Sequence, residues 1–220
     1  RNRLKNGKYP YVEAALQVSH GPKQKEYLEH KRELMTSILG GKKVNIRKLS
    51  HTLSNNKTYN TYRWCKTNKY FRQMHRCLYS NNGKKLVTKQ VLGYLDAHSL
   101  ALWFFDDGTL RSYTNKQGVV SSLGFELCVQ SDTEQECIDI VNWMKETFNI
   151  DARTCIMKGR YNVRGATQAA INLCQAIESY AVPSMMYKVA PAVRFIIRKS
   201  AKHPHQFDLA GDDIVRTTEE

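Results

Sequence analysis

The sequence predicts an α+β fold built from two related halves, each with the element order α-β-β-α-β-β-α. Three observations support this prediction: a strand-to-helix segment recurs, several segments alternate apolar and polar residues, and one helix is apolar on every face. Residues 16–27 (L-Q-V-S-H-G-P-K-Q-K-E-Y) and 127–138 (L-C-V-Q-S-D-T-E-Q-E-C-I) both run from a strand into a helix, about 111 residues apart. We therefore expect a pseudo-two-fold pair of half-domains whose antiparallel strands together form a curved surface.

The first half begins with a strand and a helix. Residues 11–20 place an apolar residue at every second position, which is the pattern of a half-buried strand. Residues 23–39 follow with apolar residues at helical spacing, and Gly40-Gly41 ends the helix. Two strands around the turn formers Ser54-Asn55-Asn56 and two short helices complete this half: residues 44–53, 57–67, 70–79 and 88–95.

The second half repeats this order. Its first helix contains Leu100-Ala101-Leu102-Trp103-Phe104-Phe105, which is apolar on all faces and is therefore expected in the core. Residues 119–130 alternate as a strand does, and Thr133 with Glu136 forms a T-x-x-E capping box that begins a helix. A hairpin that turns at Lys158-Gly159-Arg160 and a last helix complete this half: residues 152–163 and 167–180.

The composition is that of a globular protein in a reducing compartment. Of the 220 residues, 41% are hydrophobic and 10% aromatic, which is ordinary for a chain that buries a core. No apolar run approaches the roughly 20 residues of a membrane-spanning helix, so we expect no membrane partner. The six cysteines form no C-x-x-C pair, which predicts reduced thiols, an intracellular location and no zinc site: Cys65, Cys77, Cys128, Cys137, Cys155 and Cys174.

The charge is unevenly distributed along the chain. The formal net charge is +14, yet residues 1–97 hold 21 Lys and Arg against 5 Asp and Glu, whereas residues 98–220 hold 13 against 15. This excess is larger than solubility requires and favours a polyanionic partner, because basic residues that neutralise phosphates release counterions. The basic residues alternate with tyrosines on strands and line no amphipathic helix, which favours nucleic acid over an anionic membrane.

An acidic pair, Asp106-Asp107, follows the apolar helix and precedes Gly108. Carboxylates at the C-terminus of a helix oppose its dipole, which is unfavourable by about 0.3–1 kcal/mol each. One interpretation is a solvent-exposed helix end that the glycine terminates. The other is that a divalent cation holds the carboxylates, since Mg²⁺ is bound by carboxylate and water oxygens.

Residues 100–108, L-A-L-W-F-F-D-D-G, resemble the LAGLIDADG motif in the W-F-(M/F)-D-D-G form that is typical of the second copy in monomeric homing endonucleases and related intron maturases. V-P-S-M-M-Y-K-V at residues 182–189 resembles the closing P-x-x-M-Y-K segment of that family. N-N-G-K-K at residues 81–85 resembles the basic loop that precedes the second copy. With the strand-to-helix step at residues 17–27, the resemblance covers most of residues 11–190.

This resemblance implies a site-specific, Mg²⁺-dependent endonuclease of the homing type, which hydrolyses double-stranded DNA at a long target site. In the family, two motif helices pack side by side, and each ends in one acidic metal ligand. By position, Asp107 matches the metal ligand. Lys188 and Lys85 (or its neighbour Lys84) match the catalytic lysines, and Gln130 matches a polar residue that faces the active-site water.

The resemblance also implies that strand side chains read base edges in the major groove, while lysines contact the DNA backbone. Candidates in the first half are Arg47, His51, Lys57, Asn60, Arg63 and Lys66. Candidates in the second half are Arg111, Tyr113, Lys116, Arg153, Lys158, Arg160 and Arg164. Residues 53–60 and 111–118, rich in Asn and Lys, are expected to be loops that become ordered on DNA.

The resemblance divides the chain into LAGLIDADG half-domains at residues 1–97 and 98–198 and a polar tail at 199–220. No motif helix precedes the first repeat, and Arg1-Asn2-Arg3 resembles the segment that follows the first motif. We therefore expect one of the two metal carboxylates here and low activity of the chain alone. Three explanations are open: the first helix was lost from the sequence at hand, a separate polypeptide supplies it as a partner, or it is absent altogether. Two alternatives on the same scaffold are a maturase that binds intron RNA and a catalytically inactive DNA-binding protein.

Overall fold

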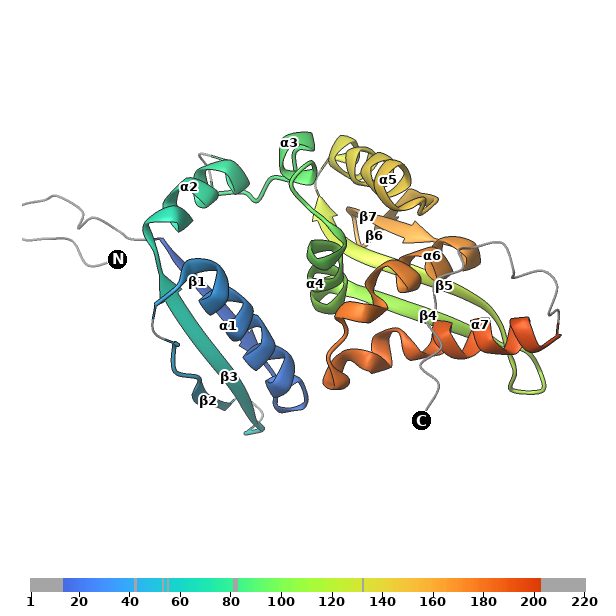
Figure 1. The fold of residues 1–220 in the computed structure, drawn as a ribbon, viewed down its shortest axis with the longest axis horizontal. Helices are drawn as coiled ribbons and strands as arrows, with labels where there is room; N and C mark the ends of the chain where they lie inside the picture. The colour runs from blue at the N-terminus through green and yellow to red at the C-terminus, as the bar shows by residue number, and fades with distance from the viewer. Residues whose placement is uncertain are drawn as a thin grey trace, which may run out of the picture.

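The computed structural model describes residues 14–41, 43–52, 54, 56–80, 83–131 and 133–202, apart from the side chains of 130, 131, 201 and 202. This part of the chain contains two antiparallel sheets and their helices (Figure 1). The strand order is β1-β3-β2 in the first sheet and β4-β5-β7-β6 in the second. The α+β fold predicted from the sequence is confirmed.

The first sheet is covered on one face by a single long helix (Figure 1). Its central strand β3 pairs with β1, where Val18 lies opposite Trp64, and with β2, where Arg47 lies opposite Arg63. The Trp64 indole donates a hydrogen bond of 3.1 Å to the Leu28 carbonyl of that helix. The elements in chain order are β1 (Ala15–His20), the 3₁₀ turn η1 (Pro22–Gln24), α1 (Lys25–Leu39), β2 (Arg47–Thr52), β3 (Thr58–Thr67), α2 (Lys69–Leu78) and α3 (Lys89–Leu92).

The second half repeats this element order. The succession β5-α5-β6-β7-α6 corresponds to β1-α1-β2-β3-α2, as the recurring sequence segment predicts. The elements are α4 (Ala97–Asp107), β4 (Gly108–Thr114), β5 (Val120–Ser131), α5 (Glu134–Phe148), β6 (Ala152–Met157), β7 (Arg160–Gly165), α6 (Thr167–Ile177), the 3₁₀ helices η2 (Glu178–Tyr180) and η3 (Pro183–Lys188), and α7 (Ala190–Lys202).

The main core lies between the second sheet and the helices that cover one of its faces. Phe104 of α4 packs edge-on against Phe125 of β5, with ring centroids 6.4 Å apart, and both are buried. Tyr27 of α1 also belongs to this core, since it is fully buried and its hydroxyl donates to the Leu102 carbonyl of α4 at 3.2 Å. The first half is therefore docked on the second through α1 and α4, which lie between the two sheets (Figure 1).

Both ends of α4 are set by local chemistry. The Asp96 side chain caps the N-terminus by accepting a hydrogen bond of 2.8 Å from the Ser99 backbone, and the hydrogen bonds from Ser99 lower the pKa of this carboxyl. At the other end the Gly108 N–H donates to the Phe104 carbonyl, and the chain turns directly into β4. A Cβ at Gly108 would lie 2.0 Å from the Phe104 ring, so the turn requires glycine.

Two loop predictions are partly wrong. Thr58 begins β3 inside the expected loop 53–60, and β4 continues to Thr114 inside the expected loop 111–118. The segment T-L-R-S-Y-T is rich in strand formers and pairs with β5, which outweighs its basic and polar character. Helix α7 extends to Lys202, across the expected start of the tail at residue 199, and residues 203–220 lie outside the described residues.

We predict that Gly108→Ala destabilises the protein by about 1–3 kcal/mol, because the new methyl group overpacks against the buried Phe104 ring. Thermal or urea unfolding measures the change. Gly21→Ala is the matched control, since no atom lies within 4 Å of its Cβ position and its φ of −71° suits alanine. Equal stability of the two variants would contradict the packing account of this turn.

Candidate metal and nucleic-acid site

The Asp107 carboxylate is exposed at the C-terminal end of the buried helix α4. Within the described part of the chain it has no hydrogen-bond or ion-pair partner. Its charge nevertheless acts on its surroundings. Burial raises the pKa of Tyr27 and Asp107 adds to that shift, whereas burial lowers the pKa of Lys188 and Asp107 opposes that shift. A carboxylate that is exposed, unpaired and fixed on a buried helix is suited to bind a ligand.

Asp106 is placed differently from its neighbour. The Lys31 ammonium donates to both of its carboxylate oxygens, at 2.5 and 2.6 Å, and His20 Nε2 lies 3.6 Å from Oδ1. Lys31 is only 11% exposed, and its burial lowers its pKa although Asp106 acts in the opposite direction. Asp106 is thus engaged by side chains of the first half, which leaves Asp107 as the available carboxylate.

His20 completes this network between the halves. Burial and the Lys31 charge lower the pKa of His20, despite the opposing effect of Asp106, so the imidazole is neutral at pH 7. Nε2 then accepts from Lys31 at 3.2 Å, and Nδ1 donates to Gln24 Oε1 at 3.2 Å. Gln24 in turn donates to the Tyr187 hydroxyl of η3.

Lys188 holds the C-terminal end of α4. Its ammonium donates to the carbonyl oxygens of Phe104 (3.2 Å), Phe105 (2.7 Å) and Gly108 (2.8 Å). Burial lowers the pKa of Lys188, while Asp106 and Asp107 raise it. Because the Phe104 and Phe105 carbonyls belong to the negative end of the helix dipole, Lys188 stabilises the helix end that carries Asp107.

The other two predicted catalytic residues come from the connection after α2 and from β5. Lys85 is exposed on the connection after α2, where it forms a β-bridge with Tyr79. Lys84, its alternative, is held there because its carbonyl accepts hydrogen bonds from Ser80. Gln130 lies in β5, but its side chain is outside the described part of the structure.

The second sheet has one face covered by helices and one that we call its open face. Leu110 and Phe125 point to the helices, so the residues that alternate with them point to the open face. On this rule the open face carries five of the predicted DNA-binding residues: Arg111, Tyr113, Arg153, Arg160 and Arg164. The other two lie in the turns next to it: Lys116 and Lys158.

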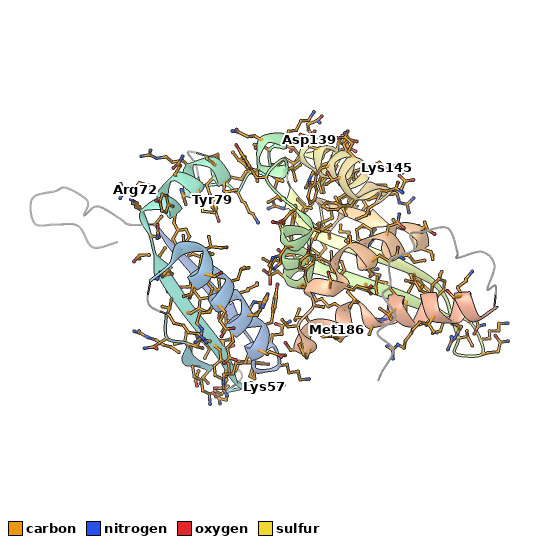
Figure 2. All side chains as sticks on the ribbon, in the orientation of Figure 1. Lys57, Arg72, Tyr79, Asp139, Lys145 and Met186 are labelled. Carbon is orange, nitrogen blue, oxygen red and sulfur yellow. The ribbon has the colours of Figure 1, made fainter. Side chains whose placement is uncertain are left out.

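The predicted residues of the first sheet divide between its two faces. Arg47 lies opposite Arg63, and by alternation His51 shares their face, which is the one away from α1. Asn60 and Lys66 alternate to the same face as Trp64, toward α1, and Asn60 accepts a hydrogen bond from Ser50 at 2.8 Å. Lys57 lies in the β2–β3 turn at the far end of the sheet (Figure 2).

The strands of both sheets carry almost no negative charge. Over the strand residues that the structure describes, β1 to β7 contain a single acidic residue, Glu126. Its side chain is 4% exposed and pairs with Arg111 and Arg164. The faces away from the helices are consequently basic.

Comparison with known proteins identifies the family. The profile of the LAGLIDADG DNA endonuclease family matches residues 7–171. The chain belongs to the LAGLIDADG family. The matched range includes the D-D-G at the end of α4, and the resemblance seen in the sequence is confirmed.

Individual relatives share part of their length with this LAGLIDADG chain. It is 27% identical over 182 residues to "Protein RecA" of Mycobacterium shimoidei. The aligned segment covers 80% of this chain but only 40% of that protein. It is 30% identical over 171 residues to "Cytochrome b mRNA maturase bI2" of Debaryomyces hansenii, covering 74% of the chain and 60% of the relative. The chain thus spans between about a quarter and two-fifths of the RecA relatives it matches.

A solved structure has the same fold. The homing endonuclease I-WcaI bound to its DNA recognition sequence superimposes with a TM-score of 0.69, at 20% sequence identity, over 83% of this chain and 78% of that one. In the LAGLIDADG chain described here, no helix of the described residues is both long and apolar enough to cross a membrane.

Sequence reasoning missed the residues that surround the LAGLIDADG helix end. Lys31 lies within an ordinary amphipathic helix, and Glu126 occupies an ordinary polar position of an alternating strand, so no local pattern distinguishes either. Their partners are 75 residues away for Lys31 and 15 and 38 residues away for Glu126. Only the fold brings these charges together.

We predict that Lys188→Met lowers the stability of the fold by about 2–3 kcal/mol, because three buried carbonyls lose their charged donor. Urea unfolding measures this change. Lys145→Met is the control, since Lys145 is exposed on α5 (Figure 2). A midpoint for Lys188→Met equal to that of the control would show that the ammonium does not stabilise the helix end.

Proposed function

We propose that this protein is a metal-dependent, site-specific endonuclease that hydrolyses double-stranded DNA. The observation that carries the proposal is the Asp107 carboxylate, which is exposed and unpaired among the described residues at the end of a LAGLIDADG helix. Its neighbour Asp106, by contrast, is engaged by Lys31. Asp107 is instead available to a ligand.

The chemistry of Asp107 suits Mg²⁺, a hard cation that prefers oxygen donors. Asp107 would hold the ion, and Lys188 would keep the helix end in place. Among the described residues, no three His, Cys, Asp or Glu side chains are grouped as a metal site, so the remaining ligands would be phosphate oxygens, water and an acidic group from another segment or polypeptide. When bound, the cation would stabilise the charge that develops on the phosphate.

The basic faces of the two sheets support duplex DNA as the substrate. Arg47 and Arg63 in the first sheet, and Arg153 and Arg164 in the second, lie opposite each other on neighbouring strands. Such rows of arginines can contact phosphates and base edges along a groove. That a homing endonuclease of the same fold has been solved with its DNA is in keeping with this proposal.

A second candidate function is assistance of intron RNA folding without cleavage. The observation that favours it is the 30% identity to a cytochrome b mRNA maturase. A fluorescence titration with duplex DNA and with structured intron RNA as competitors separates the two. Tighter binding to the RNA, without cleavage of any duplex, would favour the maturase.

We predict that Asp107→Asn lowers the cleavage rate by about 100-fold or more, because the amide no longer supplies a charged metal ligand. DNA affinity should change little. The assay incubates the chain with Mg²⁺ and a plasmid library carrying random inserts, with and without a peptide that supplies a second LAGLIDADG helix, and measures linear product.

Asp151→Asn is the control for this experiment, because Asp151 is exposed and follows α5, where its loss should leave cleavage unchanged. Equal rates of the wild type and Asp107→Asn, in a reaction where the wild type cleaves, would contradict the assignment of Asp107 as a metal ligand.

We predict that Arg63→Ala weakens DNA binding and makes the negative slope of log K against log salt concentration shallower by about 0.9, the effect of one lost phosphate contact. Titration of a duplex at several salt concentrations measures the slope. Lys145→Ala, which removes the same charge from α5 on the other half, should leave it unchanged. An unaltered slope for Arg63→Ala would remove this residue from the phosphate contacts.

A further inference from the structure

We propose that Glu126 is a positioning residue for sequence readout, which holds Arg111 and Arg164 in place so that their guanidinium groups recognise guanine in the DNA target. This inference rests on the proposed function, since it concerns how the DNA is read. Its basis is a buried carboxylate at the centre of an otherwise basic surface.

Both arginines bind the same oxygen of Glu126. Arg111 Nη2 lies 2.5 Å from Oε2, and Arg164 Nη2 lies 3.3 Å from it. The Glu126 side chain is 4% exposed, whereas the two arginine side chains are 44% and 37% exposed. The carboxylate therefore lies beneath the guanidinium groups, which remain open to solvent.

The backbone fixes where these three side chains stand. Glu126 of β5 lies directly opposite Arg164 of β7, and Arg111 of β4 lies opposite Gly124, two residues before Glu126 and on the same face. The two arginines thus reach Glu126 from the strands on either side of it. Arg164 also lies 3.2 Å from the Met157 sulfur, which limits its movement further.

A depression lies beside this cluster. It has a volume of about 230 Å³ and is lined by Arg111, Tyr113, Arg153 and Arg164 around Gly124. A Cβ at Gly124 would lie 3.3 Å from the Gly165 carbonyl and 3.7 Å from the Tyr113 ring, so any side chain there would fill the space. Because glycine has no side chain, the edge of a DNA base can approach the arginines closely here.

The arrangement favours base readout over simple phosphate binding. A phosphate site gains most from uncompensated positive charge, whereas here a carboxylate neutralises part of it. A guanidinium held by a carboxylate keeps further N–H donors for a bidentate contact with O6 and N7 of guanine. Because the side chains are already ordered, less conformational entropy is lost on binding.

The experiment compares the wild type with Glu126→Gln, which keeps the shape and removes the charge. Each chain selects duplexes from a pool with a randomised target region, and the bound fraction is sequenced. Glu146→Gln is the matched control, because it makes the same charge change on the exposed side of α5. Affinity for a duplex of mixed sequence is measured in parallel.

We expect the wild type and Glu146→Gln to select the same motif, with a guanine preference at one or two positions. Glu126→Gln should lose that preference, about 5- to 100-fold per base pair, while it binds the mixed duplex at least as tightly because a negative charge is gone. Arg164→Gln should lose the same positions. Equal preferences in wild type and Glu126→Gln would overturn the inference while leaving the proposed function intact.

A second measurement does not depend on DNA. In the wild type, the NMR signals of the Arg111 and Arg164 guanidinium groups should show slow rotation about Nε–Cζ, and in Glu126→Gln this rotation should become fast. Fast rotation in the wild type would show that the carboxylate does not hold the arginines. A wild-type chain that enriches no sequence at all would overturn both the proposed function and this inference.

Discussion

The buried C-terminal end of α4 is the constraint on which the site depends. The last turn of a helix leaves carbonyls without partners, and in a core these must be satisfied by another donor. Lys188 supplies that donor to three carbonyls at once. It also balances a helix end that carries two carboxylates at the negative pole of the dipole, an arrangement that would otherwise be unfavourable.

The two carboxylates at this end have separate roles because their surroundings differ. Asp106 is held by Lys31, which comes from the first half, so the charge balance of the site requires that half to be docked. The buried Tyr27, bonded to the Leu102 carbonyl, keeps α1 against α4. The geometry around Asp107 is therefore a property of both halves, although Asp107 itself belongs to the second.

The sequence predicts those parts of the fold that follow a local period. The all-apolar turn at Leu100-Phe105, the alternating strands and the repeat are visible because burial imposes a spacing on them. Strand β4 could not be predicted in the same way, because its basic and polar residues show no clear alternation. Its pairing with β5 decides its structure. The motif identifies Asp107, whereas the contacts of Lys31 and Glu126 follow from tertiary structure and have no local signature.

The alternation of side chains along a strand also explains why the net charge of each half does not predict the charge of its open sheet face. Residues 98–220 hold slightly more acidic than basic residues, which by itself would suggest weak binding of this segment to DNA. Most of the acidic residues that the structure describes in this segment lie on α5 and at the end of α4, away from the open face, and the one on the strands, Glu126, is buried beneath two arginines. Because a field depends on where charges stand and how exposed they are, the open face is basic although its half is not. A carboxylate in this position gives order to the arginines above it, so the same residue that lowers the net charge can raise the selectivity of the surface.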